Sequence, residues 1–368
     1  MSSTNLATAL VAPFEHLRMT DVESVGGKNA SLGEMISQLA AAGVRVPGGF
    51  ATTAHAFRQF LAHDGLAQKI KDRLAALNTD DVHALADAGA QIRQWIEQTP
   101  FPKDLDSAIR AEFERLTAEN PGASFAVRSS ATAEDMPDAS FAGQQDTYLW
   151  ISSADDVVHN VRKCWSSLFT DRAIAYRHSM GYLQQAIAMS VGVQKMIDPL
   201  ASGVAFTLNP SNGDRSQIAV DASWGLGEAV VSGEVTPDNF LIDKVLREVV
   251  KREISDKHIE YRLNGSGVVE KADVEQERRK SPSVTDEDLI AIAMLARRAE
   301  KHYGCPQDIE WAIDRHLPTG ENVVMLQSRP ETVWSQKPRE PVAKSAYSGL
   351  SSIVSTLLSP MHDKDSKS

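Results

Sequence analysis

A single arginine at the end of a short apolar run is the first candidate for chemistry in this sequence. Arg128 follows three apolar residues, a pattern typical of a buried strand. The hydroxyl residues Ser129, Ser130 and Thr132 come next. A planar guanidinium beside several hydroxyls can hold a phosphate, and Gly143 further on would let a ligand approach the backbone. An ordinary surface loop rich in serine and aspartate has a similar composition, so this segment alone leaves both interpretations open.

A lysine that follows a pair of glycines is the second candidate. Lys28 comes directly after Gly26 and Gly27, and apolar residues then recur at helical spacing as far as Leu39. Backbone N–H groups at a helix start, together with a lysine, favour an anion through the helix dipole and through direct hydrogen bonds. The alternative is a plain helix start, because Gly-Gly-Lys is common and does not match the Walker A pattern.

Two runs of alternating polar and apolar residues predict an antiparallel hairpin. The first run begins at Asp308, the second ends at Arg329, and a turn-rich stretch lies between them. Pairing around that turn places Glu310 opposite Gln327. Asp308 then lies opposite Arg329, and all four side chains share one face of the sheet. The other face receives the apolar residues Ile309, Trp311, Ile313, Val324 and Leu326.

The polar face of this predicted hairpin has the side chains that a magnesium–phosphate complex needs. Glu310 and Gln327 supply oxygen ligands for Mg²⁺, and Arg329 supplies a cation for phosphate. The alternative is an ordinary exposed face on which Asp308 simply pairs with Arg329. A slip of one residue in the register would move these side chains to the opposite face.

Length and composition narrow the class of protein. The chain has 368 residues, of which 42% are hydrophobic, which suits a globular protein with an ample core. A net charge of -11 argues against a general nucleic-acid or anionic-membrane surface. Cys164 and Cys305 lack metal-type spacing, and the sequence has neither a signal-peptide pattern nor a long apolar run. We therefore expect a soluble, cytoplasmic protein.

The remaining patterns predict a mixture of helices and strands. Helical stretches are expected at about 55–118 and 156–183, and a capping box at Thr285 indicates the start of another helix. The glycine-rich segment 223–233 does not match G-x-G-x-x-G, so a dinucleotide fingerprint is rejected. The polar segment 271–280 is expected to form a loop. Strands are expected at 189–197, 218–222, 239–243 and 247–254, the last two as a hairpin.

Taken together, these segments resemble the nucleotide-binding domain of the phosphoenolpyruvate synthase and pyruvate phosphate dikinase family and, more distantly, that of rifampicin phosphotransferase. The resemblance covers about residues 20–335 and runs through several separate blocks in one order. The blocks are Val25-Gly-Gly-Lys-Asn-Ala-Ser-Leu32, Val46-Pro-Gly-Gly-Phe50, Phe125-Ala-Val-Arg-Ser-Ser-Ala-Thr-Ala-Glu-Asp135, Phe141-Ala-Gly-Gln-Gln-Asp-Thr147, Trp224-Gly-Leu-Gly-Glu228, Asp308-Ile-Glu-Trp311 and Leu326-Gln-Ser-Arg-Pro330.

The resemblance implies an α+β protein with the ATP-grasp fold, in which two lobes enclose ATP. The first lobe, residues 10–192, would contain a helical insertion, and the second would span residues 193–337. The residues that the resemblance implies for ATP binding are Lys28, Arg128, Gly143, Thr147, Gln194, Glu310, Gln327 and Arg329. Within that set Glu310 and Gln327 would hold Mg²⁺, and Lys28, Arg128 and Arg329 would act in catalysis.

The family's phosphoryl acceptor has no counterpart in the sequence. In fused members, a following domain carries a histidine in a Thr-Cys-His-Ala setting. This histidine takes the β-phosphoryl group of ATP, with release of AMP and phosphate. None of the ten histidines here lies in such a setting. The chain therefore looks like the ATP-binding subunit of phenylphosphate synthase, a split relative that phosphorylates phenol, and we expect a histidine-bearing partner subunit.

A short amphipathic helix is predicted in the tail, residues 338–368. Its apolar residues recur at helical spacing between serine-rich flanks. They are Leu350, Ile353, Val354, Leu357 and Leu358. This helix either docks a partner subunit or folds back on the chain.

Three functions stay open on the sequence. The first is a phosphotransferase subunit that acts on a partner's histidine, with a pyruvate or antibiotic phosphotransferase as a related alternative. The second is a self-contained ATP-grasp ligase or small-molecule kinase that releases ADP. The third is a subunit that binds ATP without turnover. The blocks shared with the family argue against the second function. The third function is opposed by the presence of the candidate site residues Lys28, Arg128, Glu310, Gln327 and Arg329.

Overall fold

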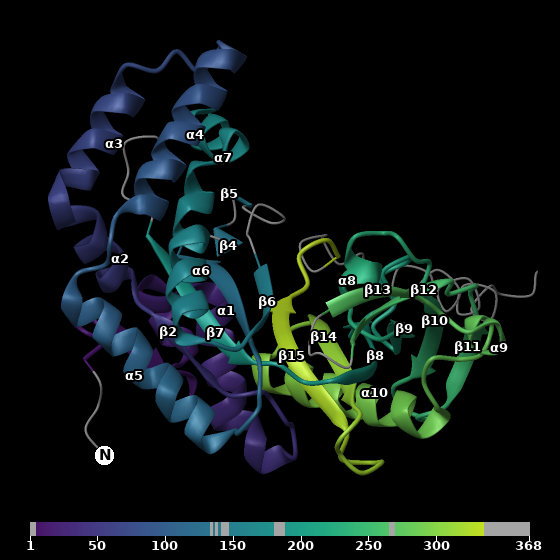
Figure 1. The fold of residues 1–368 in the computed structure, drawn as a ribbon. Helices are drawn as coiled ribbons and strands as arrows, with labels where there is room; N and C mark the ends of the chain where they lie inside the picture. The colour runs from purple at the N-terminus through teal and green to yellow at the C-terminus, as the bar shows by residue number, and fades with distance from the viewer. Residues whose placement is uncertain are drawn as a thin grey trace, which may run out of the picture. The chain divides into compact units, whose positions relative to one another are not determined.

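The computed structural model of the protein describes residues 5–132, 135–136, 139–140, 147–179, 188–264 and 269–334 (Figure 1). The chain divides into two compact units, Met1–Glu331 and Thr332–Ser368, and the fold of the first unit is given below. Gly143 and the predicted amphipathic helix of the tail lie outside the described residues.

The first sheet has five antiparallel strands in the order β1-β2-β7-β3-β6. Arg128 is the only residue of β3 that is not fully buried, because apolar and small residues surround it on the strand. The strands are β1 (Val11–Pro13), β2 (Gly49–Thr52), β3 (Phe125–Ala131), β6 (Thr147–Ile151) and β7 (Met189–Lys195).

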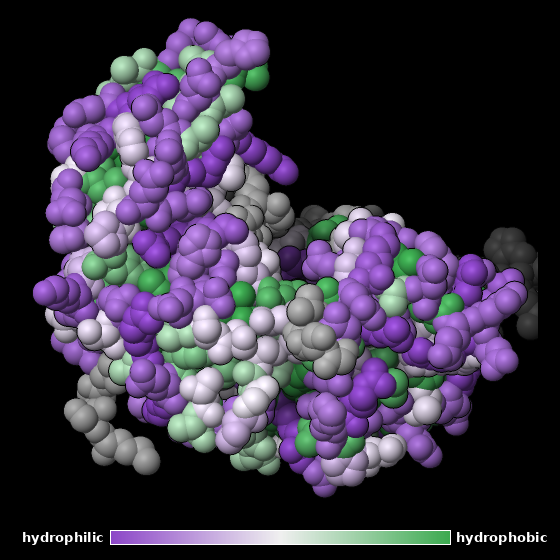
Figure 2. All heavy atoms as spheres, in the orientation of Figure 1, coloured by the Kyte–Doolittle hydropathy of each residue, from purple (hydrophilic) through white to green (hydrophobic). Residues whose placement is uncertain are grey.

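Helices accompany this sheet and share one apolar core with it. Trp165 is fully buried there, and its ring stacks on that of Phe60 with 5.2 Å between centroids. Hydrophilic side chains dominate the visible faces of α3 and α4 in Figure 2, because their apolar residues point to the core. The predicted helical stretches are confirmed within the described residues as α2 (Ala54–Ala62), α3 (Leu66–Ala75), α4 (Val82–Gln98), α5 (Lys103–Glu119), α6 (Ala154–Ser166) and α7 (Asp171–Ser179).

The second sheet has six antiparallel strands in the order β11-β10-β9-β8-β14-β15. Helix α10 (Asp286–Tyr303) packs its apolar residues into the same core as the buried Trp311 of β14. Its predicted capping box is confirmed, since the Thr285 hydroxyl accepts from the Asp288 amide at 3.1 Å. The strands are β8 (Pro199–Phe206), β9 (Gln217–Trp224), β10 (Asp238–Asp243), β11 (Val249–Glu253), β14 (Gln307–Asp314) and β15 (Val323–Pro330).

Shorter elements complete the described part of the first unit. Helix α1 (Val22–Glu34) continues as a π-helical segment, Met35–Leu39. Two small ribbons pair β4 (Asp135–Met136) with β5 (Ala139–Ser140) and β12 (Ile259–Leu263) with β13 (Val269–Asp273). The helical turns are α8 (Glu228–Val231), α9 (Gln276–Arg279) and the 3-10 helices Phe14–His16, Met19–Asp21, Ala40–Ala42, His63–Gly65 and Ser167–Phe169. No described helix is long and apolar enough to cross a bilayer.

The segments 271–280 and 199–206 show why some elements escaped the sequence-based prediction. The predicted loop at 271–280 is wrong, because its first residues belong to β13 and most of the rest to α9. Strand β13 carries polar residues on both faces of an exposed ribbon, so it lacks the alternation that marks a strand. Strand β8 was not predicted because it begins with Pro199 and contains Gly203, two residues that weaken a strand pattern. A side chain at Gly203 would collide with the Asp221 carbonyl.

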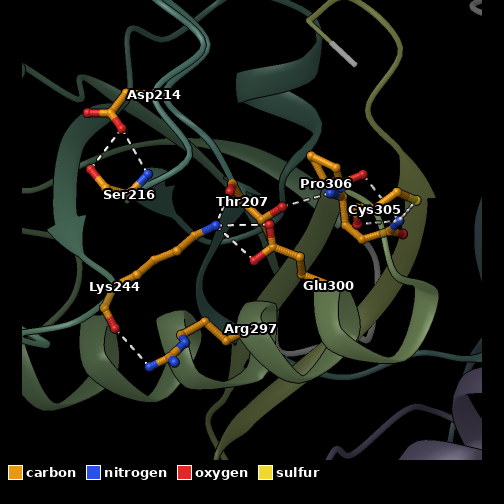
Figure 3. A network of polar contacts seen from close by, with 9 residues as sticks. Thr207, Asp214, Ser216, Lys244, Arg297, Glu300, Cys305 and Pro306 are labelled. Atoms are coloured by element: carbon orange, nitrogen blue, oxygen red, sulfur yellow. Dashed lines mark hydrogen bonds and ion pairs between the residues drawn. The ribbon is translucent and has the colours of Figure 1, made fainter. Parts of the chain in front are cut away.

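A polar network fixes the beginning of β14 (Figure 3). Lys244 Nζ donates to the two carboxylate oxygens of Glu300 at 2.9 and 2.8 Å, and also to the Thr207 carbonyl. The Thr207 hydroxyl accepts from the Gln307 amide at 2.7 Å. The network therefore joins β8, the end of β10 and helix α10 to the first residue of the strand that carries Asp308 and Glu310.

A glycine kink interrupts α1 just before Lys28. Gly26 has φ 75° and ψ 162°, outside the helical region, so the helical conformation restarts at Gly27. A Cβ atom at Gly26 would overlap both the hydroxyl and the carbonyl oxygen of Ser130. The kink thus lets the helix carrying Lys28 approach the strand that carries Arg128.

Replacing Gly26 by alanine is expected to destabilise the protein strongly. A φ of 75° with ψ 162° lies in a region nearly restricted to glycine and costs alanine about 1–3 kcal/mol, and the overlap with Ser130 costs about 1–3 kcal/mol more, so the unfolding free energy should fall by roughly 2 kcal/mol or more. Chemical denaturation measures the loss. Gly65→Ala is the control for a positive φ without a steric overlap, because Gly65 has φ 68° and ψ 15° in the left-handed region and open space around it. Equal losses in the two variants would show that contact with Ser130 contributes nothing.

Candidate functional site

Arg128 connects the two sheets. On β3 it lies between Thr147 of β6 and Gly192 of β7. Its Nη2 donates to Glu310 Oε2 at 3.2 Å and to Gln327 Oε1 at 3.0 Å. These two acceptors stand on β14 and β15 of the second sheet. One guanidinium group therefore meets both predicted metal ligands at the place where the sheets face each other.

The predicted register of the hairpin is confirmed at its polar residues. Asp308 lies opposite Arg329, and Glu310 lies opposite Gln327. Side chains of directly opposed residues share a face of an antiparallel sheet, so the four polar residues lie on one side. The face carrying Glu310 and Gln327 is the one that meets Arg128.

A bulge changes the predicted apolar face beyond that point. The register shifts between Glu310 and Trp311, so Trp311 lies opposite Met325 and Leu326 is the extra residue. The core face consequently takes Met325 and Val323, and the placement of Val324 and Leu326 on that face was wrong. Because side chains alternate along a strand, one extra residue reverses the facing of those that follow.

A cavity of about 240 Å³ brings four of the predicted site residues together. Arg128, Thr147, Gln194 and Glu310 all line it. Gln194 is 4% exposed, and its Nε2 donates to the Pro47 carbonyl at 3.3 Å. The apolar part of the wall includes Leu149, Met196, Ile197, Leu226, Val230, Trp311 and Leu326. The cavity thus combines a charged region at Arg128 with an extensive apolar lining.

Arg329 does not line this cavity. Its side chain is 58% exposed, and its Nε lies 3.4 Å from Asp308 Oδ2. Burial raises the pKa of the Asp308 carboxyl, and the charge of Arg329 opposes that shift. The other carboxylate oxygen of Asp308 is buried without a hydrogen-bond partner in the described part of the chain. Arg329 is therefore a largely exposed cation two residues beyond Gln327 on β15.

Lys28 stands in the first turn after the Gly26 kink, where the helical conformation restarts inside α1, so the predicted glycine loop at a helix start is a kink in a helix that begins at Val22. Its side chain is half-buried and does not line the cavity. The following residue, Asn29, donates its amide to the Ser130 hydroxyl at 3.4 Å, two residues beyond Arg128. Lys28 is thereby held next to the strand of Arg128.

Two hydroxyls that the sequence suggested as phosphate donors have protein partners. The Ser130 hydroxyl is fully buried against Asn29, and the Thr132 hydroxyl donates to the Ala188 carbonyl at 3.0 Å. Such buried bonds keep the end of β3 in place. Gly143, the predicted point of backbone approach, lies outside the described residues.

Glu310 and Gln327 are the residues bonded to Arg128 whose oxygen atoms could serve as ligands of a divalent cation. Both atoms lie within 3.2 Å of one guanidinium nitrogen, so they converge on a point that favours positive charge. The described ranges hold no group of three or more histidine, cysteine or acidic residues suited to a metal. Two protein oxygens nevertheless suit Mg²⁺, which usually keeps several waters and binds substrate phosphates for its other positions.

Sequence reasoning missed much of the cavity wall. Met196 and Ile197 lie in the segment between β7 and β8, where no motif marks them. Leu226, Gly227 and Glu228 also line the cavity. They belong to the glycine-rich segment that was rejected as a dinucleotide fingerprint. The glycines of that segment indicated a place where a ligand could bind, because glycine before a short helix permits close approach of a ligand.

Comparison with known proteins assigns the chain to a family. The model of the pyruvate phosphate dikinase AMP/ATP-binding domain matches residues 22–349, so the chain belongs to this family. It is 49% identical to the phosphoenolpyruvate synthase of Neisseria meningitidis serogroup B, over 90% of this chain and 43% of that protein. It is 48% identical to the phosphoenolpyruvate synthase of Escherichia coli K12, over 91% of this chain and 43% of that protein.

The chain spans less than half the length of these relatives. Among solved structures, D-alanyl-alanine synthetase A of Vibrio cholerae aligns with 61% of this chain and 46% of its own. The TM-score is 0.24 and the identity 10%, a likeness too weak to bear on the fold. The described architecture is a mixed α and β protein with antiparallel sheets.

Proposed function

We propose that the chain is the ATP-binding part of a phosphotransferase that uses Mg-ATP to phosphorylate a histidine. The observation that carries the proposal is the meeting of Arg128 with Glu310 and Gln327 beside a cavity with an apolar wall. A nucleotide needs these two environments together, an apolar space for the base and cations for the phosphates. The family assignment supports the same ligand.

The apolar wall suits the adenine ring. Leu149, Met196 and Ile197 line the cavity, and Leu226 and Leu326 add further apolar surface. The phosphates would then extend towards Arg128, with Lys28 and Arg329 as further cations and Thr147, Gln194 and Gly143 as additional nucleotide contacts. In this proposal residues 10–192 and 193–337 are the two lobes of an ATP-grasp fold, followed by the tail 338–368.

The proposed metal ligands are Glu310 and Gln327. A bound Mg²⁺ would supply positive charge to neutralise the phosphates. Arg128 would keep the phosphoryl group aligned through directed N–H donors, while Lys28 and Arg329 would stabilise the charge that develops during transfer. Phosphoryl transfer needs little covalent work from the protein, so positioned cations account for most of the proposed catalysis.

The proposed acceptor is a histidine outside this sequence, on a partner subunit of the same enzyme. ATP, water and the imidazole would give AMP, phosphate and phosphohistidine. Onward transfer to phenol, as in phenylphosphate synthase, is the proposed fate of the phosphoryl group. The names of the matched relatives favour a second candidate, in which the histidine serves a phosphoenolpyruvate synthase reaction.

Product analysis tests the reaction type. The chain, Mg²⁺ and ATP are incubated with and without the candidate histidine-bearing subunit, and nucleotides are separated by chromatography. AMP and phosphate formed only with the partner support the proposal. ADP formed by the chain alone would replace it with a self-contained kinase or ligase.

Replacing Glu310 by alanine is expected to remove the Mg²⁺ dependence of nucleotide binding. The carboxylate is one of only two proposed protein ligands, so the gain in ATP affinity on adding Mg²⁺ should fall about 100-fold or more. Titration calorimetry with and without Mg²⁺ measures it. Glu253→Ala is the matched control, since Glu253 is an exposed partner of Lys251. An unchanged Mg²⁺ effect in Glu310→Ala would remove Glu310 from the metal site.

A further inference from the structure

Helix α1 is bonded to the first sheet through Asn29. The Asn29 side chain is 2% exposed, and its Nδ2 donates to Ser190 Oγ on β7 at 2.8 Å and to the Val25 carbonyl at 3.1 Å. Its backbone amide donates to the Ser130 hydroxyl on β3. The residue directly after Lys28 is therefore tied to two strands, one of which carries Arg128.

The same helix is bonded to the second sheet through Ser31. The Ser31 hydroxyl donates to the Ser328 carbonyl of β15 at 2.8 Å, and both residues are buried. The Tyr303 hydroxyl lies 3.4 Å from the Ser31 hydroxyl. Ser328 lies between Gln327 and Arg329 on β15, so the bond from Ser31 joins helix α1 to the residue between two proposed site residues.

Ser328 itself is firmly held. Its hydroxyl donates to Gln307 Oε1 at 2.9 Å, and Gln307 is fully buried. The Gln307 amide in turn donates to the Thr207 hydroxyl. The bonds of Ser328 hold its carbonyl in place, so the hydrogen bond from the Ser31 hydroxyl to that carbonyl fixes the position of Ser31.

We infer that Ser31 and Asn29 are positioning residues that set Lys28 relative to Arg128 on one side and to Gln327 and Arg329 on the other. Lys28 and Ser31 are three residues apart, so they lie on the same face of the helix, one turn from each other. The inference rests on the proposed function, because it concerns how the cations of that site are aligned. A displacement of about 1 Å at such a site is enough to lower the rate markedly.

The test is a double-mutant cycle between Ser31 and Lys28. Ser31→Ala alone is expected to lower ATP affinity or turnover about tenfold, the upper range for one buried hydrogen bond. In the Lys28→Ala background the same substitution should have no further effect, because the lysine it positions is gone. Asn29→Ala should show the same dependence on Lys28. Calorimetry and turnover are measured well below the melting temperature of every variant.

Ser37→Ala is the matched control. The Ser37 hydroxyl donates to the Glu34 carbonyl within the same helical segment at 3.2 Å and contacts neither sheet through that bond. It should leave affinity and turnover unchanged. Losses for Ser31→Ala that persist in full without Lys28, or a lowered melting temperature with unchanged affinity, would overturn the positioning role. Absence of ATP binding by the unmodified chain would overturn the proposed function and this inference with it.

Discussion

Replacing Arg128 by alanine is expected to lower phosphoryl transfer from ATP about 10³-fold, the range for removing one preorganised cation from a phosphoryl-transfer site. Arg128 lines the cavity together with Lys195 and Glu310, and two hydrogen bonds from its Nη2 to Glu310 and Gln327 hold it there. Its removal takes away the donors that would align the phosphates and leaves Glu310 uncompensated. The rate of AMP release in the presence of the histidine-bearing partner measures the loss.

Arg279→Ala provides the control for Arg128→Ala. Arg279 is an exposed arginine whose Nε pairs with Asp256 at 2.7 Å. Its replacement should leave the transfer rate unchanged within a factor of two, roughly the value expected for a surface site. Circular dichroism confirms that both variants are folded. Normal transfer by folded Arg128→Ala would remove Arg128 from the assignment.

Replacing Asp238 by alanine is expected to cost about 3–5 kcal/mol of unfolding free energy, the usual loss when one partner of a buried ion pair is removed. Asp238 and Lys257 are both fully buried, and Nζ lies 2.6 Å from Oδ1. The other carboxylate oxygen accepts from the Ser283 amide at 2.9 Å and from its hydroxyl at 2.8 Å. The substitution therefore leaves a buried ammonium group and two Ser283 donors without their acceptor.

Lys251→Ala is the control for that stability change. Lys251 pairs with Glu253 at 2.7 Å, but both side chains are at least half exposed. An exposed pair contributes about 0–1 kcal/mol, so the control should be nearly neutral. Urea denaturation of both variants gives the comparison. A loss for Asp238→Ala no larger than that for Lys251→Ala would show that the buried pair adds no stability.

The pairing of the polar residues in the β14–β15 hairpin was predictable from the sequence, but the bulge in this hairpin was not. Alternation placed Glu310 opposite Gln327 and Asp308 opposite Arg329, as the structure has them. The bulge after Glu310 was not foreseen, because an extra residue in one strand changes no composition or spacing that a pattern records. It places Leu326 at the cavity instead of in the core.

The cavity wall escaped prediction for a different reason. Met196, Ile197 and Leu149 are far from Leu226 in the sequence and become neighbours only through the arrangement of the strands. An apolar residue that lines a cavity has the same local pattern as one in a core. Arg128 was recognisable because a charged residue inside an otherwise buried strand needs a partner or a ligand.

The fate of the β-phosphoryl group of ATP shows directly whether this chain phosphorylates a histidine on a partner. The chain is incubated with Mg²⁺, ATP labelled at the β-phosphate and the candidate histidine-bearing subunit, and the proteins are separated from the nucleotides. We expect label on a histidine of the partner, with AMP released, and a rate of labelling about 10³-fold lower when Arg128 is replaced by alanine. Label that stays in ADP, with none on the partner, would contradict it.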